Sequence, residues 1–327
     1  MMATPTPEPA SRAGARLDVV IVNWNSGPHL AACLEAIAAS PADVARIARI
    51  IVVDNASSDA SVKLDGFQGR LPLDVIANAE NRGFGAACNQ GAAAGSAEAI
   101  LFLNPDVRIR PGALAQSLDY LVADRARPIG ALGIRLTDEN GVAQRCCARF
   151  PTPWRFIGQA LRLDRLMPSL VAPHFMLEFD HLTTREVDQV MGAFLMMPRA
   201  QFSQLGGFDE RFFVYFEDVD LCLRARQGGA SVTHYALPCA VHEGQGTTRA
   251  IKDVRLFYSL RSRLLYAGKH FSRSGLALTL FATLILEAGT RSGAALLRGS
   301  FTELGATLRG YHLLWAALRQ LDLRGRG

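Results

Sequence analysis

The sequence has no C-x-x-C pair among its six cysteines, and the adjacent residues Cys146 and Cys147 belong to no regular framework. Disulfide scaffolds and structural zinc modules both depend on regularly spaced cysteines, so we expect reduced thiols and no zinc site. Residues 1–16 contain no apolar run, so they give no sign of a secretory signal peptide and predict a disordered tail. These absences together predict a cytoplasmic protein.

Two common nucleotide-binding loops are also missing. There is no P-loop, and the turn after the first apolar run has one glycine, Gly27, and the bulky Trp24 where a G-x-G-x-x-G loop would approach a pyrophosphate. A dinucleotide-binding domain is therefore excluded. A nucleotide held by its base and ribose, with the diphosphate left to a metal ion, remains compatible with the sequence.

The residues that are present predict an α/β protein. The 327 residues are 49% hydrophobic, enough for one large domain with an appendage. Short apolar runs of strand length alternate with segments of helical periodicity, which is typical of a mostly parallel sheet flanked by helices. The expected strands are Leu17–Asn23, Arg49–Asp54, Leu73–Ala77 and Ala99–Leu103, and the expected helices include His29–Ala39 and Gly85–Ala94.

Polar residues follow each of the expected strands. Asn23 ends the first and Asn25 comes just after it, Asp54 ends the second, Asn78 follows the third, and Asn104-Pro105-Asp106 follows the fourth. Such residues are common turn formers, but the carboxyl ends of parallel strands are also where α/β sheets bind ligands. A carboxylate at this edge suits a hard divalent cation, so both a turn and a ligand site are open for Asp106.

Charge is distributed unevenly along the chain. Residues 249–327 contain 13 lysines and arginines against 4 acidic residues, a net charge of +9, whereas the whole chain carries +5. This basic region contains a basic and aromatic helical stretch, 257–271, and then twelve residues without charge, 275–286. Twelve residues are too few to cross a bilayer, so we expect this segment to pack on the core or lie on a membrane face. Nucleic-acid binding lacks any recognition motif.

Six motifs follow one another along the chain: Val20–Asn25, Val52–Asp59, Glu80–Gly91, Leu103–Asp106, Gly192–Phe194 and Gly206–Arg224. In this order they resemble the inverting family-2 glycosyltransferases of the A-type fold, and most closely the bacterial rhamnosyltransferases that use a deoxythymidine-diphosphate (dTDP) sugar. The resemblance implies a catalytic domain over 17–248, after the tail 1–16 and before a basic helical C-terminal region, 249–327.

The resemblance also implies a donor site. It assigns Asp54 to the pyrimidine base and puts Asn104-Pro105-Asp106 in the place of the family's Asp-x-Asp motif. Because Asn104 offers only a neutral oxygen, Asp106 is the principal expected ligand of Mg²⁺ or Mn²⁺, and His242 resembles a family histidine near the metal or diphosphate. The donor-nucleotide residues that we expect are Asn23, Asn25, Asp54, Arg82 and Asn104.

Glu217 and Asp218 open a predicted helix over 219–226, where acidic residues also favour the helix dipole. The resemblance implies that Asp218 is the general base, which takes the proton of the acceptor hydroxyl, and that Glu217 orients the acceptor or the base. Single displacement at the anomeric carbon would invert its configuration without an enzyme nucleophile.

The implied reaction moves a 6-deoxyhexose, L-rhamnose, from a dTDP-sugar to a cell-envelope glycan or a polyprenyl-linked acceptor. A UDP-sugar donor is the second choice. The implied location is the cytoplasmic face of the plasma membrane, with peripheral contact through 249–327. The alternative is a non-catalytic carbohydrate- or membrane-binding relative that has kept the fold, an alternative that the substitution at Asn104 would favour.

Overall fold

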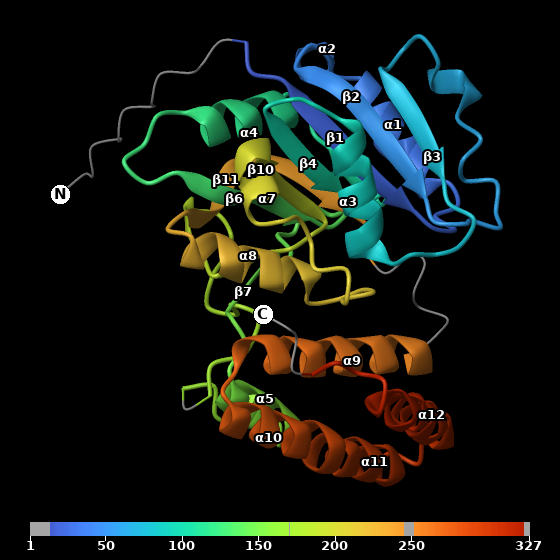
Figure 1. The fold of residues 1–327 in the computed structure, drawn as a ribbon, viewed down its shortest axis with the longest axis vertical. Coiled ribbons are helices and arrows are strands. Elements are labelled where there is room, and N and C mark those ends of the chain that lie inside the picture. The colour runs from blue at the N-terminus through green and yellow to red at the C-terminus, as the bar shows by residue number, and fades with distance from the viewer. Residues whose placement is uncertain (1–13, 170, 245–251, 324–327) are drawn as a thin grey trace.

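The computed structural model describes residues 14–169, 171–244 and 252–323, so most of the predicted N-terminal tail lies outside the described residues. A curved central sheet forms the upper part of the molecule in Figure 1. Its strand order is β3-β2-β1-β4-β10-β6-β11-β5, with β8 beside β11. The strands are β1 Leu17–Asn23, β2 Ile47–Asp54, β3 Leu73–Ala77, β4 Ala99–Leu103, β5 Val107–Ile109, β6 Ile129–Thr137, β8 Arg185–Glu186, β10 Phe194–Pro198 and β11 Ser231–His242.

The predicted sheet is confirmed, because β1, β2, β3 and β4 run parallel to one another. Every residue of β1 and β4 is buried, as expected for strands that are covered by helices on both faces. The sheet is not wholly parallel, since β10 enters between β4 and β6 and runs antiparallel to both. A second, two-stranded sheet pairs β7, Cys147–Ala148, with β9, Gln189–Val190.

Helices cover the sheet where the periodicity predicts them. Helix α3 packs directly on β1, and a side chain at Gly91 would place its Cβ only 2.4 Å from Val20 Cγ1. The alanine- and glycine-rich composition of α3 is thus what permits this close approach. The helices of this part are α1 His29–Ala38, α2 Pro41–Val44, α3 Phe84–Ala94, α4 Ala113–Val122, α7 Arg199–Gln204 and α8 Glu217–Gln227, with a 3-10 turn, η1, at Asp65–Phe67.

A separate helical layer lies below the sheet in Figure 1. It contains the C-terminal helices and also α5, which comes from the middle of the chain and packs against α10 and the π-helix η2. The elements are α5 Pro153–Ala160, α6 Leu163–Leu166, α9 Lys252–His270, α10 Arg273–Phe281, η2 Ala282–Glu287, α11 Ala288–Leu297 and α12 Phe301–Leu318. The expected boundary near residue 248 therefore does not separate all of the helical layer from the catalytic part.

The prediction of a short apolar segment over 275–286 is wrong in its length. Helix α10, η2 and α11 form one continuous helix from Arg273 to Leu297, 25 residues long, which by length and composition alone is apolar enough to cross a membrane. The charged residue Glu287, which ends the uncharged run in the sequence, does not end the helix because Arg263 and Arg291 bind its carboxylate. Only 22% of the apolar window is buried, so core packing does not account for most of it.

Helix α9 joins the helical layer to the loop that precedes α8. Ser262 Oγ donates a hydrogen bond of 2.8 Å to the carbonyl of Val214. At the C-terminal end of α9, Lys269 and His270 both lie 2.7 Å from the buried carboxylate of Asp220 in α8. Removing one partner from such a buried charge cluster is costly, so these contacts hold α9 firmly against the catalytic part.

Candidate active site

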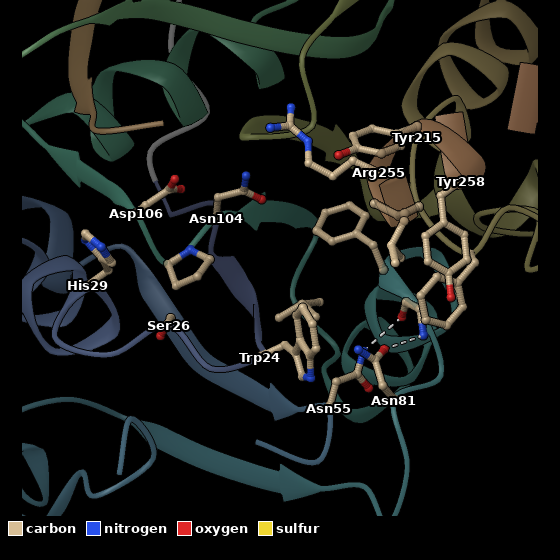
Figure 2. Close-up of a pocket in the computed structure, with 17 residues that line it drawn as sticks. Trp24, Ser26, His29, Asn55, Asn81, Asn104, Asp106, Tyr215, Arg255 and Tyr258 are labelled. Carbon is tan, nitrogen blue, oxygen red and sulfur yellow. Dashed lines mark hydrogen bonds between the residues drawn. The ribbon is translucent and has the colours of Figure 1, made fainter. Parts of the chain in front are cut away.

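A cleft of about 630 Å³ lies beyond the carboxyl ends of β1 and β4. The turn after β4 contributes Asn104 and Asp106, and the turn after β1 contributes Trp24 and Ser26 (Figure 2). On the opposite side in the same view lie Tyr215, Arg255 and Tyr258. Of the nine predicted site residues, Asn104 and Asp106 line this cleft directly.

Asp106 and His242 are brought together by the pairing of β5 with β11. The antiparallel register sets His242 opposite Val107, and His242 Nε2 then lies 3.5 Å from Asp106 Oδ2. Nδ1 of the same imidazole is 3.0 Å from Gln144 Oε1, an acceptor, which assigns the ring proton to Nδ1 and leaves the Nε2 lone pair toward Asp106.

The chemistry of this pair suits a divalent cation. Asp106 Oδ1 is buried and has no hydrogen-bond partner within the described part of the chain. A buried carboxylate oxygen without a partner is unfavourable, and a metal ion would relieve that cost. The residues here that could hold a divalent ion are Asp106, through its carboxylate, His242, through its Nε2 nitrogen, and Asn104, through its side-chain oxygen.

The predicted nucleotide residues Asn23, Asn25 and Asp54 form a hydrogen-bonded network behind the cleft. Asn23 Nδ2 donates to Asp54 Oδ1 at 2.9 Å, and Asn25 Oδ1 accepts from the backbone N–H of Ser58 at 2.7 Å. Asn23 is fully buried and Asp54 is only 6% exposed. This network links the loops after β1 and β2, while the neighbouring residues Trp24, Ser26 and Asn55 face the cleft.

Arg82 lies outside the cleft lining, whereas the residues on either side of it, Asn81 and Gly83, are part of that lining. Its side chain is 43% exposed and lies 4.0 Å from Glu210, which makes a weak, solvated ion pair. Gly83 has φ +86°, and a Cβ there would meet the Phe213 carbonyl at 2.5 Å. Glycine is therefore required where this loop contacts the one before α8.

The two acidic residues at the start of α8 follow a strained turn. Tyr215 and Phe216 both have positive φ angles, of 68° and 69°, a conformation that bulky residues adopt rarely and that occurs often at functional sites. This turn directs the Tyr215 side chain into the cleft and begins the helix at Glu217 rather than at Val219.

The carboxylate of Asp218 is held by two backbone hydrogen bonds. Its Oδ2 accepts a hydrogen bond of 2.9 Å from the N–H of Gly192, and its Oδ1 accepts one of 2.8 Å from Val219. Burial raises the pKa of Asp218, although these two N–H groups and the amide of Gln189 counteract part of the shift. Asp218 is not part of the cleft lining, and its carboxylate contacts the segment that follows β9.

Glu217 is more deeply buried, at 6% exposure. Burial, and next the charge of Asp218, raise its pKa well above the ordinary value for a glutamate. Its Oε2 has no partner among the residues that the structure describes. Two neighbouring carboxyl groups in such surroundings do not both ionise readily. Because the pKa of Glu217 is raised more than that of Asp218, Asp218 is the more readily ionised of the two.

Arg255 and Tyr258 are site residues that the sequence analysis missed. Both come from α9, which we had assigned only to the helical region, and Tyr258 stacks on Phe213 with ring centroids 4.6 Å apart. In Figure 2 the guanidinium group of Arg255 points across the cleft toward the side that holds Asn104 and Asp106. Arg255 makes no ion pair within the described ranges. The only signal in the sequence is the basic and aromatic composition of this stretch.

Several known proteins resemble this chain in sequence. Residues 18–182 match the model of a family described as glycosyl transferase family 2. The chain is 30% identical over 241 residues to the N-acetylglucosaminyl-diphospho-decaprenol L-rhamnosyltransferase of Mycobacterium tuberculosis, covering 65% of this chain and 71% of that protein. It is 25% identical over 171 residues to the rhamnosyltransferase WbbL of Escherichia coli, covering 52% and 61%.

The fold is also similar to that of a solved structure, the mannosyltransferase PcManGT from Pyrobaculum calidifontis in complex with GDP-Man and Mn²⁺. The TM-score is 0.55 at 17% sequence identity, over 97% of this chain and 85% of the other. This likeness supports the A-type fold with its C-terminal helical region.

Proposed function

This chain belongs to glycosyl transferase family 2 and is a glycosyltransferase, and from that premise we propose that it transfers L-rhamnose from a dTDP-sugar to a polyprenyl-linked glycan with inversion. Relatives named as rhamnosyltransferases support the choice of sugar. The name of the mycobacterial relative, which includes a diphospho-decaprenol, supports a lipid-linked acceptor. A product built on such an acceptor would serve the synthesis of a bacterial cell-envelope polysaccharide. The observation that carries the proposal is the pair of distinct carboxylate sites, Asp106 in the cleft and Asp218 at the start of α8, outside the cleft lining.

Asp218 would act as the general base. Its two backbone hydrogen bonds fix the carboxylate, and its raised pKa makes it a stronger proton acceptor than a solvated aspartate. The acceptor hydroxyl gives its proton to Asp218 as the oxygen bonds to the anomeric carbon. The bond from that carbon to the diphosphate oxygen breaks, and the diphosphate leaves with the electron pair. Glu217 would keep the carboxylate of Asp218 in position.

The departing diphosphate needs positive charge near the turn after β4. Mg²⁺ or Mn²⁺, held by Asp106, His242 and the neutral oxygen of Asn104, would neutralise phosphate oxygens as a Lewis acid. The unpartnered oxygen of Asp106 supports this donor set, and the Mn²⁺ in the PcManGT complex is consistent with it. Arg255 adds a protein cation on the other side of the cleft, where its fixed charge would bind a phosphate oxygen.

The donor nucleotide would lie on the loops after β1 and β2. Asp54, held by Asn23 and Ser57, would accept from the pyrimidine base, with Asn25 fixing the same loop and Arg82 adding charge at the rim. Trp24 and Asn55 face the cleft from these loops and would contact the base and ribose.

The C-terminal region would bind the cytoplasmic face of the plasma membrane. Leu297 and Phe301, at the junction of α11 and α12, are 92% and 79% exposed. The net charge of +9 over 249–327 favours an anionic lipid surface. Other exposed apolar side chains of α10, η2, α11 and α12 are Leu278, Phe281, Ile285, Leu296, Leu308, Leu313 and Trp315.

Peripheral binding is favoured over a membrane span by the packing of the long helix. Glu287, in the middle of the helix, forms a buried ion pair with Arg263 of α9, and Thr290 donates a hydrogen bond to Ala160 of α5. Because α9 is itself fixed to the catalytic part, a span would require these contacts to break.

A donor panel tests the proposed function. The purified protein with Mg²⁺ or Mn²⁺ is incubated with dTDP-rhamnose, UDP-sugars and GDP-sugars and a polyprenyl-diphosphate-linked acceptor. We expect release of dTDP and a lipid product heavier by one deoxyhexose. Turnover of a UDP-hexose alone would replace rhamnose as the donor sugar, and sugar binding without turnover of any donor would favour the non-catalytic alternative.

A further inference from the structure

A buried cluster of two thiols and two imidazoles lies away from the cleft. Cys147 is the first residue of β7, and Cys146 immediately precedes it. His234 lies in β11, and His181 comes from the segment between α6 and β8. The Sγ atoms of both cysteines and one ring nitrogen of His234 all lie within 4.8 Å of one another. The exposed fractions of the four side chains are 5%, 0%, 0% and 2% in the order Cys146, Cys147, His234, His181.

The hydrogen bonds of His234 leave one nitrogen free for a metal. His234 Nε2 lies 3.0 Å from the carbonyl oxygen of His181, so this nitrogen carries the proton and donates. Nδ1 then presents its lone pair to Cys146 Sγ, 3.9 Å away. An imidazole that donates one N–H to a carbonyl and directs its other nitrogen at a thiol has the arrangement that metal-binding histidines show.

His181 lies beside these three residues and has a buried ring nitrogen without a partner in the described part of the chain. Its Nε2 is buried and finds no hydrogen-bond partner among the described residues. Its ring centroid is 5.5 Å from that of His234, with the ring planes nearly perpendicular. A buried imidazole nitrogen with no partner is unusual in a packed core, and a bound cation would provide the missing interaction.

Both sulfur atoms are buried, with Cys146 5% and Cys147 0% exposed. A reagent in solution does not reach them, so an accessible catalytic nucleophile is not the explanation for this cluster.

Cysteine spacing alone led us to expect no zinc site, but the fold brings histidines from distant segments to the Cys146-Cys147 pair. We propose that Cys146, Cys147, His234 and His181 bind one Zn²⁺ ion as a structural site. Zinc takes four nitrogen and sulfur ligands in a tetrahedron, at about 2.3 Å for sulfur and about 2.0 Å for nitrogen. Ligand atoms in such a tetrahedron are roughly 3.5 Å apart, so the atoms of Cys146, Cys147 and His234 need to close by an ångström or so. His181 lies outside the group within 4.8 Å, so its imidazole has to move toward the other three to become the fourth ligand.

The position of the site gives the ion a definite role. Cys147 pairs with Val190 of β9. Two residues of the same segment bind the carboxylate of Asp218, Gly192 through its backbone N–H and Gln189 through its side chain. Zinc bound to Cys146 and Cys147 on one side and to His234 of β11 on the other would clamp this segment to the main sheet. Loss of zinc would therefore lower the thermal stability and kcat of the enzyme more than its affinity for the donor.

Metal analysis of the full chain tests the proposal. The protein, purified without chelator, should contain about one zinc per chain by plasma mass spectrometry, and Cys146→Ser should lose it. Two variants should keep it: Cys239→Ser, a cysteine outside the cluster, and Asp106→Ala, which removes the principal carboxylate of the separate divalent-ion site in the cleft.

A spectroscopic measurement covers the case in which the cysteine variant does not fold. The zinc-free wild-type chain loaded with Co²⁺ alone should show thiolate-to-metal charge-transfer absorption, and added Zn²⁺ should abolish it and raise the melting temperature. Absence of zinc from the wild-type protein together with no thiolate band would overturn the proposal. Zinc that is lost in Asp106→Ala but kept in Cys146→Ser would also overturn it, because the ion would then belong to the cleft.

Discussion

Replacing Asp218 by asparagine isolates the proton-accepting role of this side chain. Asparagine has nearly the same shape but cannot take the proton of the acceptor hydroxyl. A positioned general base contributes on the order of 100- to 10,000-fold, which corresponds to about 2.7–5.4 kcal/mol of barrier. We therefore expect Asp218→Asn to lower kcat by at least about 100-fold while donor binding changes only a few-fold.

The structure predicts a further cost that must be separated from catalysis. The carboxylate accepts from two backbone N–H groups, of Gly192 and Val219, but the asparagine side chain has only one oxygen. One N–H then loses its acceptor, at about 1–3 kcal/mol if it stays buried. Thermal melting should show this loss of stability, and the rate should be measured well below the melting temperature. Asp124→Asn, at an exposed aspartate, serves as the control and should leave both properties unchanged.

The pH profile gives an independent readout of the same role. Burial raises the pKa of Asp218, and the base must be ionised to act. The rate should therefore fall as the pH drops through this raised pKa, at a higher pH than for a solvated aspartate near 3.9. The variant should lose this acid limb. A rate above one tenth of the wild-type value, with the acid limb intact, would refute the assignment of Asp218 as the base.

Three further predictions concern the metal ion, the diphosphate and the membrane. Asp106→Ala should abolish transfer or raise the Mg²⁺ or Mn²⁺ concentration needed for half-maximal rate, and full turnover of the wild type in excess chelator would show that protein cations suffice. Arg255→Ala should lower kcat/KM by roughly 10- to 100-fold, as expected for loss of a charge-assisted contact of about 1.5–3 kcal/mol. Lys252→Ala, on the exposed side of the same helix, should leave kcat/KM unchanged, and equal effects of the two substitutions would argue against a specific phosphate contact. The protein should float with anionic vesicles at low salt, should not bind neutral vesicles, and should dissociate partly at high salt. The double variant Leu297→Asp with Phe301→Asp should abolish flotation without unfolding the protein. Resistance of the vesicle-bound protein to salt and alkaline carbonate would indicate a spanning helix instead.

The sequence by itself was sufficient for the elements that depend on local pattern. The buried runs at β1 and β4 and the periodicity of α3 predicted these elements to within a residue, because burial on both faces of a sheet demands continuous apolar residues. The end of β4 also marked Asp106 in the sequence, since the carboxyl edge of a parallel sheet is where its loops gather. The predicted apolar segment ends before Glu287, where the uncharged run ends. The helix continues to Leu297, because Arg263 of the neighbouring helix α9 forms an ion pair with Glu287.

Contacts between distant parts of the chain were decided only by the tertiary structure. His242 meets Asp106 because β5 pairs antiparallel with β11, and no local pattern encodes that register. Arg255 reaches the cleft because α9 is hydrogen-bonded to the loop before α8, and Cys146 meets His234 across 88 residues because the small sheet packs beside β11. Sequence periodicity reports which face of an element is buried, whereas the partner against which it is buried depends on strand order and on the packing of whole layers.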